Sequence, residues 1–223
     1  MWSYTRPHFD ASYEIGIPST SVGPALCPHL HDAVQVLILS AGDRRMRVVR
    51  EEIALQAGDM LILPSRVVHG PVQGKVATWR GLNLYLDPEA PLGTTVRVIA
   101  LDRVPRWVDR PIAVPGEPIA VLLQLIGAGE VRWTGTMGAT RGAEVDAGLI
   151  ARETRIRRFV RATGMPPAAH DRMLRLDRAR RLLADGLAPA EAAAATGFAD
   201  QSHLGRLFRA VYGTSPARYA AGR

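Results

Sequence analysis

The chain has 223 residues, 47% of them hydrophobic, and a formal net charge of +7. This length gives room for one large or two modest domains, and the hydrophobic content is ample for folded cores. No apolar run reaches the roughly eighteen residues of a membrane span, and the first residues lack the apolar stretch of a signal peptide. The single cysteine, Cys27, excludes an internal disulfide. We therefore expect a cytoplasmic protein with no membrane partner.

Short apolar segments separated by glycine turns recur between Ala33 and Leu86, and they predict a β-rich N-terminal unit. Many short strands with such turns are typical of a sandwich or a small barrel. The predicted strands are residues 34–39, 45–49, 52–55, 60–64 and 76–85, with turns at 40–43 and 57–59.

Three histidines stand in this region. His29 and His31 lie on one face of an extended segment, because side chains along a strand repeat every two residues. His69 follows a turn that contains Pro64. These residues resemble the two sequence motifs of the cupin family, which run here as His29-x-His31-x3-Gln35-x6-Gly42 and as Gly58-x5-Pro64 followed by His69.

The resemblance implies a cupin-like β-barrel with a small-molecule pocket. Two positions depart from the family pattern, since Gln35 replaces the usual glutamate ligand and Arg66 replaces the usual glycine. Three imidazoles and one oxygen donor can hold a divalent metal, although a neutral glutamine is a weaker ligand than a carboxylate. Alternatively, the histidines only line a pocket for a small organic ligand. The candidate metal ligands are His29, His31 and His69, and the candidate ligand-binding residues are Gln35, Arg66 and Trp79.

The middle of the chain predicts a buried helix followed by a linker. Residues 119–126 are apolar nearly all round, so the helix packs against its own domain or against a second copy of the chain. A homodimer is therefore one open outcome. Residues 134–142 are rich in glycine and are typical of a linker.

The excess positive charge lies entirely in the C-terminal part. Residues 141–223 hold fifteen Arg, no Lys and eight acidic residues, a net charge of +7. Residues 1–140 carry thirteen basic and thirteen acidic residues and are neutral overall. A positive surface concentrated in one part of a chain is typical of a module that binds nucleic-acid phosphates.

Residues 189–209 predict two short helices joined by a tight turn at Gly197. In the second helix, apolar residues recur at helical spacing and leave a polar face that includes the residue types that contact bases and phosphates. This is the layout of a helix-turn-helix, and an ordinary amphipathic helix is the alternative. The apolar residues are Leu204, Leu207, Phe208 and Val211, and the polar face holds Gln201, Ser202, His203, Arg206 and Arg209.

Residues 176–219 closely resemble the C-terminal signature of the AraC/XylS family of transcription regulators. The matching segments are 178–183 (RARRLL), 195–204 (ATGFADQSHL), 206–209 (RLFR) and 212–219 (YGTSPARY). The resemblance implies that the helix beginning near Asp200 enters the major groove of double-stranded DNA. Its candidate base-reading residues are Gln201, Ser202, His203 and Arg206, and its candidate phosphate contacts are Arg209 and Arg218.

Members of that family carry two helix-turn-helix units joined by a long helix. We predict the long helix at residues 168–184, and residues 159–167 resemble the end of the first unit. Only residues 144–158 precede that end, which is too short for the usual two leading helices. The first unit therefore looks truncated, but arginines such as Arg155 and Arg158 could still contact phosphates.

Together these patterns predict an α+β chain, with a cupin-like β-barrel followed by an all-α helix-turn-helix domain. We expect a ligand-sensing domain at 1–110, an apolar helix and linker at 111–143, and a DNA-binding domain at 144–223. The predicted function is a sequence-specific transcription regulator that senses a small molecule and is not an enzyme. Two alternatives stay open: a metal-dependent cupin enzyme (a dioxygenase or isomerase) with a vestigial DNA-binding domain, and a non-DNA-binding antagonist of a full-length regulator.

Overall fold

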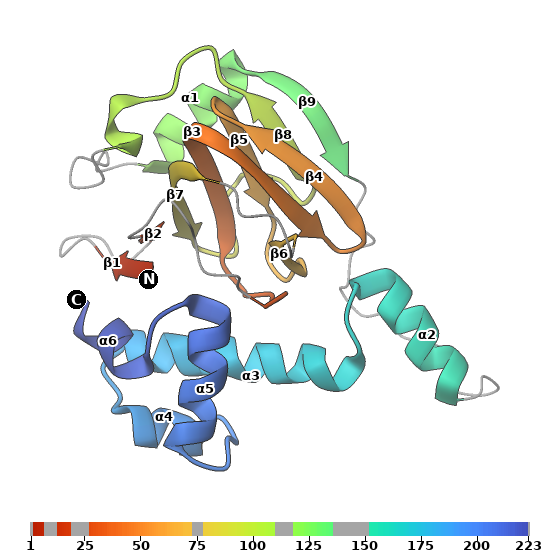
Figure 1. Ribbon diagram of the computed structural model, residues 1–223, viewed down its shortest axis with the longest axis vertical. Helices are drawn as coiled ribbons and strands as arrows, with labels where there is room; N and C mark the ends of the chain where they lie inside the picture. Colours follow the sequence, from red (N-terminus) through yellow and green to blue (C-terminus); the bar gives the residue numbers. More distant parts are fainter. Residues whose placement is uncertain are drawn as a thin grey trace.

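The computed structural model describes residues 2–6, 13–18, 27–72, 78–109, 118–135 and 152–222. A β-rich unit lies above a helical unit, and the two ends of the chain lie close together where the units meet (Figure 1). This arrangement confirms the predicted α+β class. No helix in the described part of the chain is long and apolar enough to cross a membrane.

The β-rich unit is an antiparallel sheet in the order β1-β2-β7-β3-β5-β8-β9, with β4 and β6 paired to the long strand β3. Its strands are β1 (Trp2–Thr5), β2 (Tyr13–Pro18), β3 (Val34–Val48), β4 (Glu51–Gln56), β5 (Asp59–Leu63), β6 (His69–Pro71), β7 (Trp79–Leu86), β8 (Val96–Ala100) and β9 (Glu130–Gly135). Each described pairing is antiparallel. The described strands are therefore joined by hairpins and by longer connections between antiparallel neighbours, without parallel crossovers.

The turn predicted at residues 40–43 is wrong, because this segment is part of β3. The strand continues through a register shift between Leu39 and Ala41, opposite β7. Gly42 adopts a positive φ of 76°, and a Cβ at this position would lie 2.0 Å from the carbonyl oxygen of Thr78. The glycine therefore permits a bulge rather than a reversal of the chain.

Side chains on the two faces of β3 enter two separate apolar clusters. Val36 and Ile38 face a cluster covered by η1 (Arg106–Val108) and α1 (Pro118–Ala128). Leu37 and Leu39 face the inside of the barrel, which continues toward the helical unit. Such alternation is what a two-residue side-chain period predicts for a strand that is buried on both faces.

The helix predicted at residues 119–126 packs against its own sheet. Leu122 of α1 is fully buried there, whereas Leu123 on the other side is 43% exposed. The linker predicted at 134–142 is wrong at its start, since Thr134 and Gly135 belong to β9 and pair with β8. The remainder of that linker lies outside the described residues.

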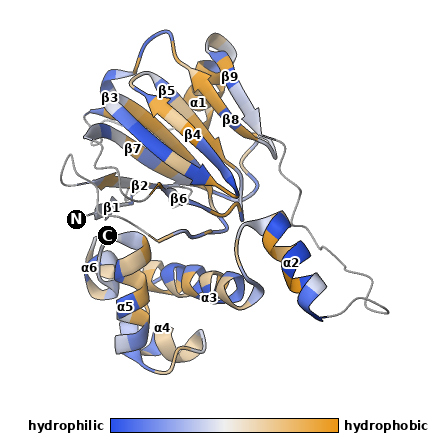
Figure 2. Ribbon diagram, turned by 45° about the vertical axis from the view of Figure 1, so that its right-hand side comes forward, coloured by the Kyte–Doolittle hydropathy of each residue, from blue (hydrophilic) through white to orange (hydrophobic). Residues whose placement is uncertain are grey.

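The helical unit consists of α2 (Arg152–Thr163), α3 (Pro167–Ala184), α4 (Pro189–Ala195), α5 (Gln201–Tyr212) and α6 (Pro216–Ala221). The predicted long helix is α3. Gly197 makes the turn before α5 with a φ of +73°, and the Asp200 side chain caps α5 by accepting a hydrogen bond from the His203 amide. Arginine-rich α2 is hydrophilic over most of its length and extends away from the other helices (Figure 2).

A single apolar cluster spans the two units. It contains Leu37 and Leu63 from the barrel together with Leu176 of α3 and Phe208 of α5. Backbone contacts reinforce the packing, since the amide of Cys27 donates to the carbonyl oxygen of Ala210 at 3.0 Å. The helical unit is therefore docked on the barrel by a continuous core.

The centre of this interface is a buried arginine, Arg180 of α3. Its guanidinium pairs with the carboxylate of Glu14 on β2, and both side chains are less than 10% exposed, at 6% and 8%. Four tyrosine rings surround the cation, with ring centroids 4.6 to 5.8 Å away. Burial lowers the pKa of Arg180, but Glu14, Tyr219, Tyr212 and Asp177 together outweigh it and keep this pKa well above its ordinary value. The tyrosines are Tyr4, Tyr85, Tyr212 and Tyr219.

We predict that Arg180→Ala lowers the free energy of unfolding by about 3–5 kcal/mol, because it leaves the Glu14 carboxylate buried without its main cation. Urea unfolding of the full chain measures this loss. Arg178→Ala is the matched control, since Arg178 is exposed two residues earlier on the same helix and should change stability by about 0.5 kcal/mol or less. Equal effects of the two substitutions would show that Arg180 does not hold the interface.

Candidate functional site

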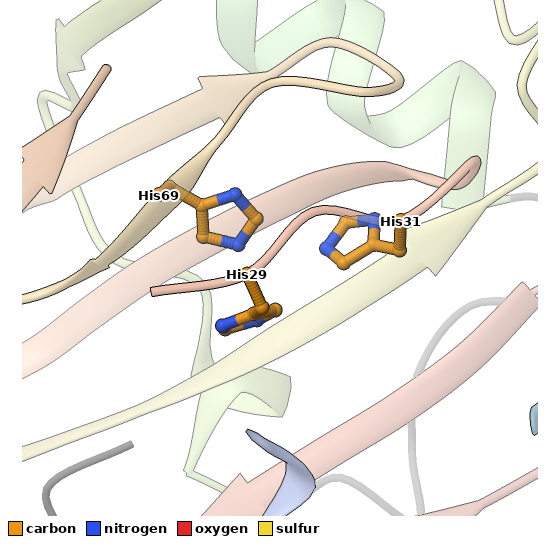
Figure 3. A group of neighbouring side chains, drawn as sticks. All are labelled: His29, His31 and His69. Carbon is orange, nitrogen blue, oxygen red and sulfur yellow. The ribbon is translucent and has the colours of Figure 1, made fainter. Parts of the chain in front are cut away.

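Three histidine side chains meet inside the barrel. His29 forms an isolated antiparallel bridge with His69 of β6, in which each amide donates to the other carbonyl at 2.8 Å. The ring centroids of His29 and His69 are 4.5 Å apart, and those of His31 and His69 are 5.0 Å apart. Figure 3 shows the three rings gathered around one point. The structure therefore brings together the residues of both predicted motifs.

Each of these rings is held by a backbone carbonyl. The Nδ1 atoms of His29, His31 and His69 lie 2.9, 2.9 and 2.8 Å from the carbonyl oxygens of residues 27, 33 and 67. A carbonyl oxygen only accepts, so Nδ1 carries the hydrogen and Nε2 of a neutral ring keeps its lone pair. Their metal-ligand atoms all lie within 4.8 Å of one another. Rings fixed in this way are typical of metal-binding histidines.

Burial keeps these histidines uncharged. It lowers the pKa of His29 to about 4 and that of His31 to about 3, and it lowers the pKa of His69 well below the usual value. Protons therefore do not compete for the three Nε2 lone pairs near neutral pH. The donor set fits a divalent ion that accepts nitrogen ligands.

Gln35 of β3 lies next to this cluster, as the cupin resemblance implied. Its side-chain amide is 2.9 Å from Nε2 of His31 and 2.6 Å from the side chain of Asn83 on β7. The amide oxygen of Gln35 faces Nε2 of His31, and the amide nitrogen donates to the side-chain oxygen of Asn83. An oxygen beside this ring nitrogen makes Gln35 the fourth candidate donor.

The other two candidate ligand-binding residues occupy different places. Trp79 is buried, and the guanidinium of Arg44 lies 4.2 Å from its ring centroid. Arg66 is not in the barrel cavity, because its half-exposed side chain pairs with Asp32 at 2.6 Å near α3. It has a positive φ of 63°, which explains why cupins usually have glycine at this position. Arg66 thus belongs to the contact between the units.

Sequence analysis missed Arg44. Its side chain is buried inside the barrel, on the same face of β3 as Met46 and Val48. The alternation from residue 44 to residue 48 is a signal that could have revealed it, since these positions share one side of a strand. The incorrect turn at 40–43 concealed that pattern.

Two cavities lie near these residues. One is a small space of about 10 Å³ inside the barrel, lined by His29, His69, Arg44, Trp2 and Val211 of α5 among others. It has room for about one water molecule. The second is an open groove of about 730 Å³ between β2, β7 and α3, which has the size of a small-molecule site. Charged side chains of both signs line the groove, including Glu14, Asp177 and Arg181.

The candidate DNA-reading residues lie mostly on the free face of α5. Gln201, Ser202, Arg206 and Arg209 are exposed, and His203 is partly covered by its contact with the ring of Phe198. Arg175 of α3, which sequence analysis missed, donates to the carbonyl oxygen of Gly197 at 2.9 Å and braces the turn before α5.

The candidate phosphate contacts are spread over three helices. Arg209 is on α5, Arg218 is exposed on α6, and α2 carries Arg155 and Arg158. Of the two on α2, Arg158 is exposed and Arg155 is partly buried. The docked barrel therefore leaves basic side chains of all three helices accessible.

Comparison with known proteins agrees with the description of the barrel unit and of the helical unit. Residues 23–129 match the family described as an AraC-like ligand binding domain, and residues 150–222 match the family described as a helix-turn-helix domain. No curated protein matches the chain.

Solved structures of ToxT from Vibrio cholerae have a similar fold. An apo ToxT variant from strain SCE256 has a TM-score of 0.52 at 10% identity, covering 95% of this chain and 98% of that chain. ToxT from strain O395 has a TM-score of 0.52 at 10% identity, covering 96% and 98%. ToxT bound to an unsaturated fatty acid has a TM-score of 0.50 at 10% identity, covering 97% of each chain. With both of its domains matched, the chain belongs to the AraC family of transcription regulators, with a ligand-binding domain followed by a helix-turn-helix domain.

Proposed function

We propose that this AraC-family regulator reads DNA with α5 and that a small molecule bound by its barrel changes this binding. The observation that carries the proposal is the division of α5 into two faces. Leu204 and Phe208 are buried, whereas Gln201, Ser202 and Arg206 are exposed and able to reach base edges. The fatty acid bound to ToxT supports a small organic effector for this fold.

The proposed domain division follows the pairing of the strands. We assign the sensing domain to the chain as far as the end of β9, because β9 pairs with β8 of the barrel. We assign the DNA-binding domain to residues 144–223. Arg209 and Arg218 contact phosphates beside α5, and Arg155 and Arg158 of α2 contact phosphates farther along the duplex.

We predict that Arg206→Ala weakens specific DNA binding by about 1–3 kcal/mol, because a guanidinium that reads a base edge is lost. A mobility shift on the protein's own upstream region, at two salt concentrations, measures the effect. Arg103→Ala is the control, since Arg103 is an exposed arginine of the barrel unit. A folded wild-type protein that shifts no specific DNA would contradict the proposal and favour the non-DNA-binding antagonist.

A homodimer would supply the specificity that one reading helix lacks, since each helix contacts few bases. We infer that the outer face of α1 and β9 joins the copies, because Leu123 is 43% exposed and Val131 is 52% exposed there.

We predict that the wild type sediments as a dimer and that Leu123→Glu sediments as a monomer, because a charge on the apolar face opposes its burial. Gln124→Glu, at the exposed neighbouring position of α1, is the control and should remain dimeric. A monomeric wild type would exclude this interface.

We also infer that the three histidines hold one divalent metal. The three fixed rings, their low pKa values and the adjacent Gln35 support this inference. A bound ion would supply a local positive charge and an open position for an oxygen ligand. The space beside the rings is about 10 Å³, which leaves room for about one water molecule.

Titration of the metal-free protein with Co²⁺, followed by absorption and calorimetry, tests the metal site. We expect one equivalent in the wild type and at least a roughly tenfold loss of affinity in His69→Gln, because a ligand atom is removed. His170→Gln is the control, because His170 lies on α3 outside the cluster. If the folded wild type binds no ion, the histidines only line the cavity.

A further inference from the structure

A buried positive charge lies inside the barrel, with no counterion among the residues that the structure describes. Arg44 is 8% exposed, and its Nη1 atom has no hydrogen-bond partner in the described part of the chain. The described residues that line the adjacent cavity include no Asp or Glu. Burial lowers the pKa of Arg44 to about 10, so the guanidinium is still charged at neutral pH. The ring of Trp79 is its main electrostatic support.

A second fixed donor faces the same cavity. Nε1 of Trp2 is buried and has no hydrogen-bond partner among the described residues, and Trp2 lines the cavity together with Arg44. An indole N–H and a guanidinium N–H can only donate, so neither satisfies the other. The side-chain amide of Asn83, which also lines the cavity, has an unpartnered nitrogen. Buried polar atoms are rarely left unpaired, and several around one cavity indicate a bound group.

Comparison with Arg180, which is also buried, shows what is unusual about Arg44. Both arginines are buried and both contact aromatic rings. Arg180 is neutralised by Glu14, whereas no carboxylate pairs with Arg44 among the described residues. A buried charge that the protein does not neutralise is costly, and such charges are concentrated at binding sites.

We propose that Arg44 and Trp2 bind the carboxylate of a small organic effector inside the barrel. The inference rests on the proposed role of the barrel as a sensor, and it names the chemistry of the effector. The planar guanidinium matches a carboxylate because it presents two parallel N–H groups, and Trp2 adds a third donor. The organic body of the effector occupies space that opens at the mouth of the barrel.

Opening that mouth requires movement of the DNA-binding domain. The cavity of about 10 Å³ accepts only about one water, and Val211 of α5 forms part of its wall. The amide of Trp2 also donates to the carbonyl oxygen of Gly213, at the end of α5, at 3.4 Å. An effector larger than water therefore displaces the end of α5. Effector binding and the docking of α5 are thus linked equilibria.

The test uses the full chain with acetate, hexanoate and benzoate as probes and with the corresponding neutral amides as controls. Calorimetry measures affinity, and a change in tryptophan fluorescence, to which Trp2 and Trp79 contribute, gives a second readout. We expect each carboxylate to bind at least tenfold more tightly than its amide. Arg44→Met should abolish this preference, and Arg44→Lys should restore part of it. Arg45→Met is the matched control, because Arg45 is the exposed neighbour of Arg44 on β3.

Thermal unfolding separates loss of the site from loss of the fold. Arg44→Met removes an unpaired buried charge, so its Tm should equal or exceed that of the wild type in the absence of carboxylate. Equal affinity for carboxylates and amides, wild-type affinity in Arg44→Met, or no binding by the folded wild type would overturn the proposal. In the last case, a buried water alone satisfies these donors.

The mobility shift distinguishes failure of this inference from failure of the proposed function. Specific DNA binding without carboxylate binding would reject the carboxylate effector and retain the regulator. Carboxylate binding without a DNA shift would retain the carboxylate effector and reject the proposed DNA-binding function.

Discussion

The buried ion pair between Arg180 and Glu14 determines how the two domains are arranged. A charge removed from water must keep its partner, since separation would leave both charges in an apolar setting. Glu14 also accepts a hydrogen bond from the hydroxyl of Tyr219 on α6 at 2.5 Å, so the pair ties β2 to two helices at once. Directional contacts of this kind allow few alternative docked arrangements, and the surrounding apolar cluster then packs around one of them.

Docking in this arrangement gives α5 two separate roles. Its C-terminal end, with Val211 and Tyr212, is buried against the barrel, and the ring centroid of Tyr212 is 6.2 Å from that of His29. Its exposed polar side chains, with Gln201 and Arg206, remain free for DNA. A rigid helix that contacts the cavity at one end and DNA along its free face is a direct physical link between them. Regulation through this link requires no contact between the effector and the DNA.

The elements that were predictable from the sequence are those determined by residues close together in the chain. The helices α3 to α5 and the Gly197 turn follow from apolar spacing and from the conformational freedom of glycine, which act within a few residues. The histidine cluster was predictable because a two-residue period and the motif resemblance place its members together. The role of Arg180 was not predictable, because its partner Glu14 is 166 positions away. Helical spacing places Arg180 on the buried stripe with Leu176 and Leu183, but it does not identify the partner of its charge.

The replacement of the usual cupin glutamate by Gln35 has a consequence for the charge of the barrel interior. Gln35 and Arg44 line the same cavity. A glutamate at position 35 would bring a permanent negative charge to that cavity and would oppose the entry of an anionic ligand. With a neutral amide, the cavity keeps the charge of Arg44, which no carboxylate pairs in the described part of the chain, beside His29 and His69. The replacement of glutamate by Gln35 weakens the site as a metal centre. The same replacement therefore leaves the positive charge of Arg44 available to an anion.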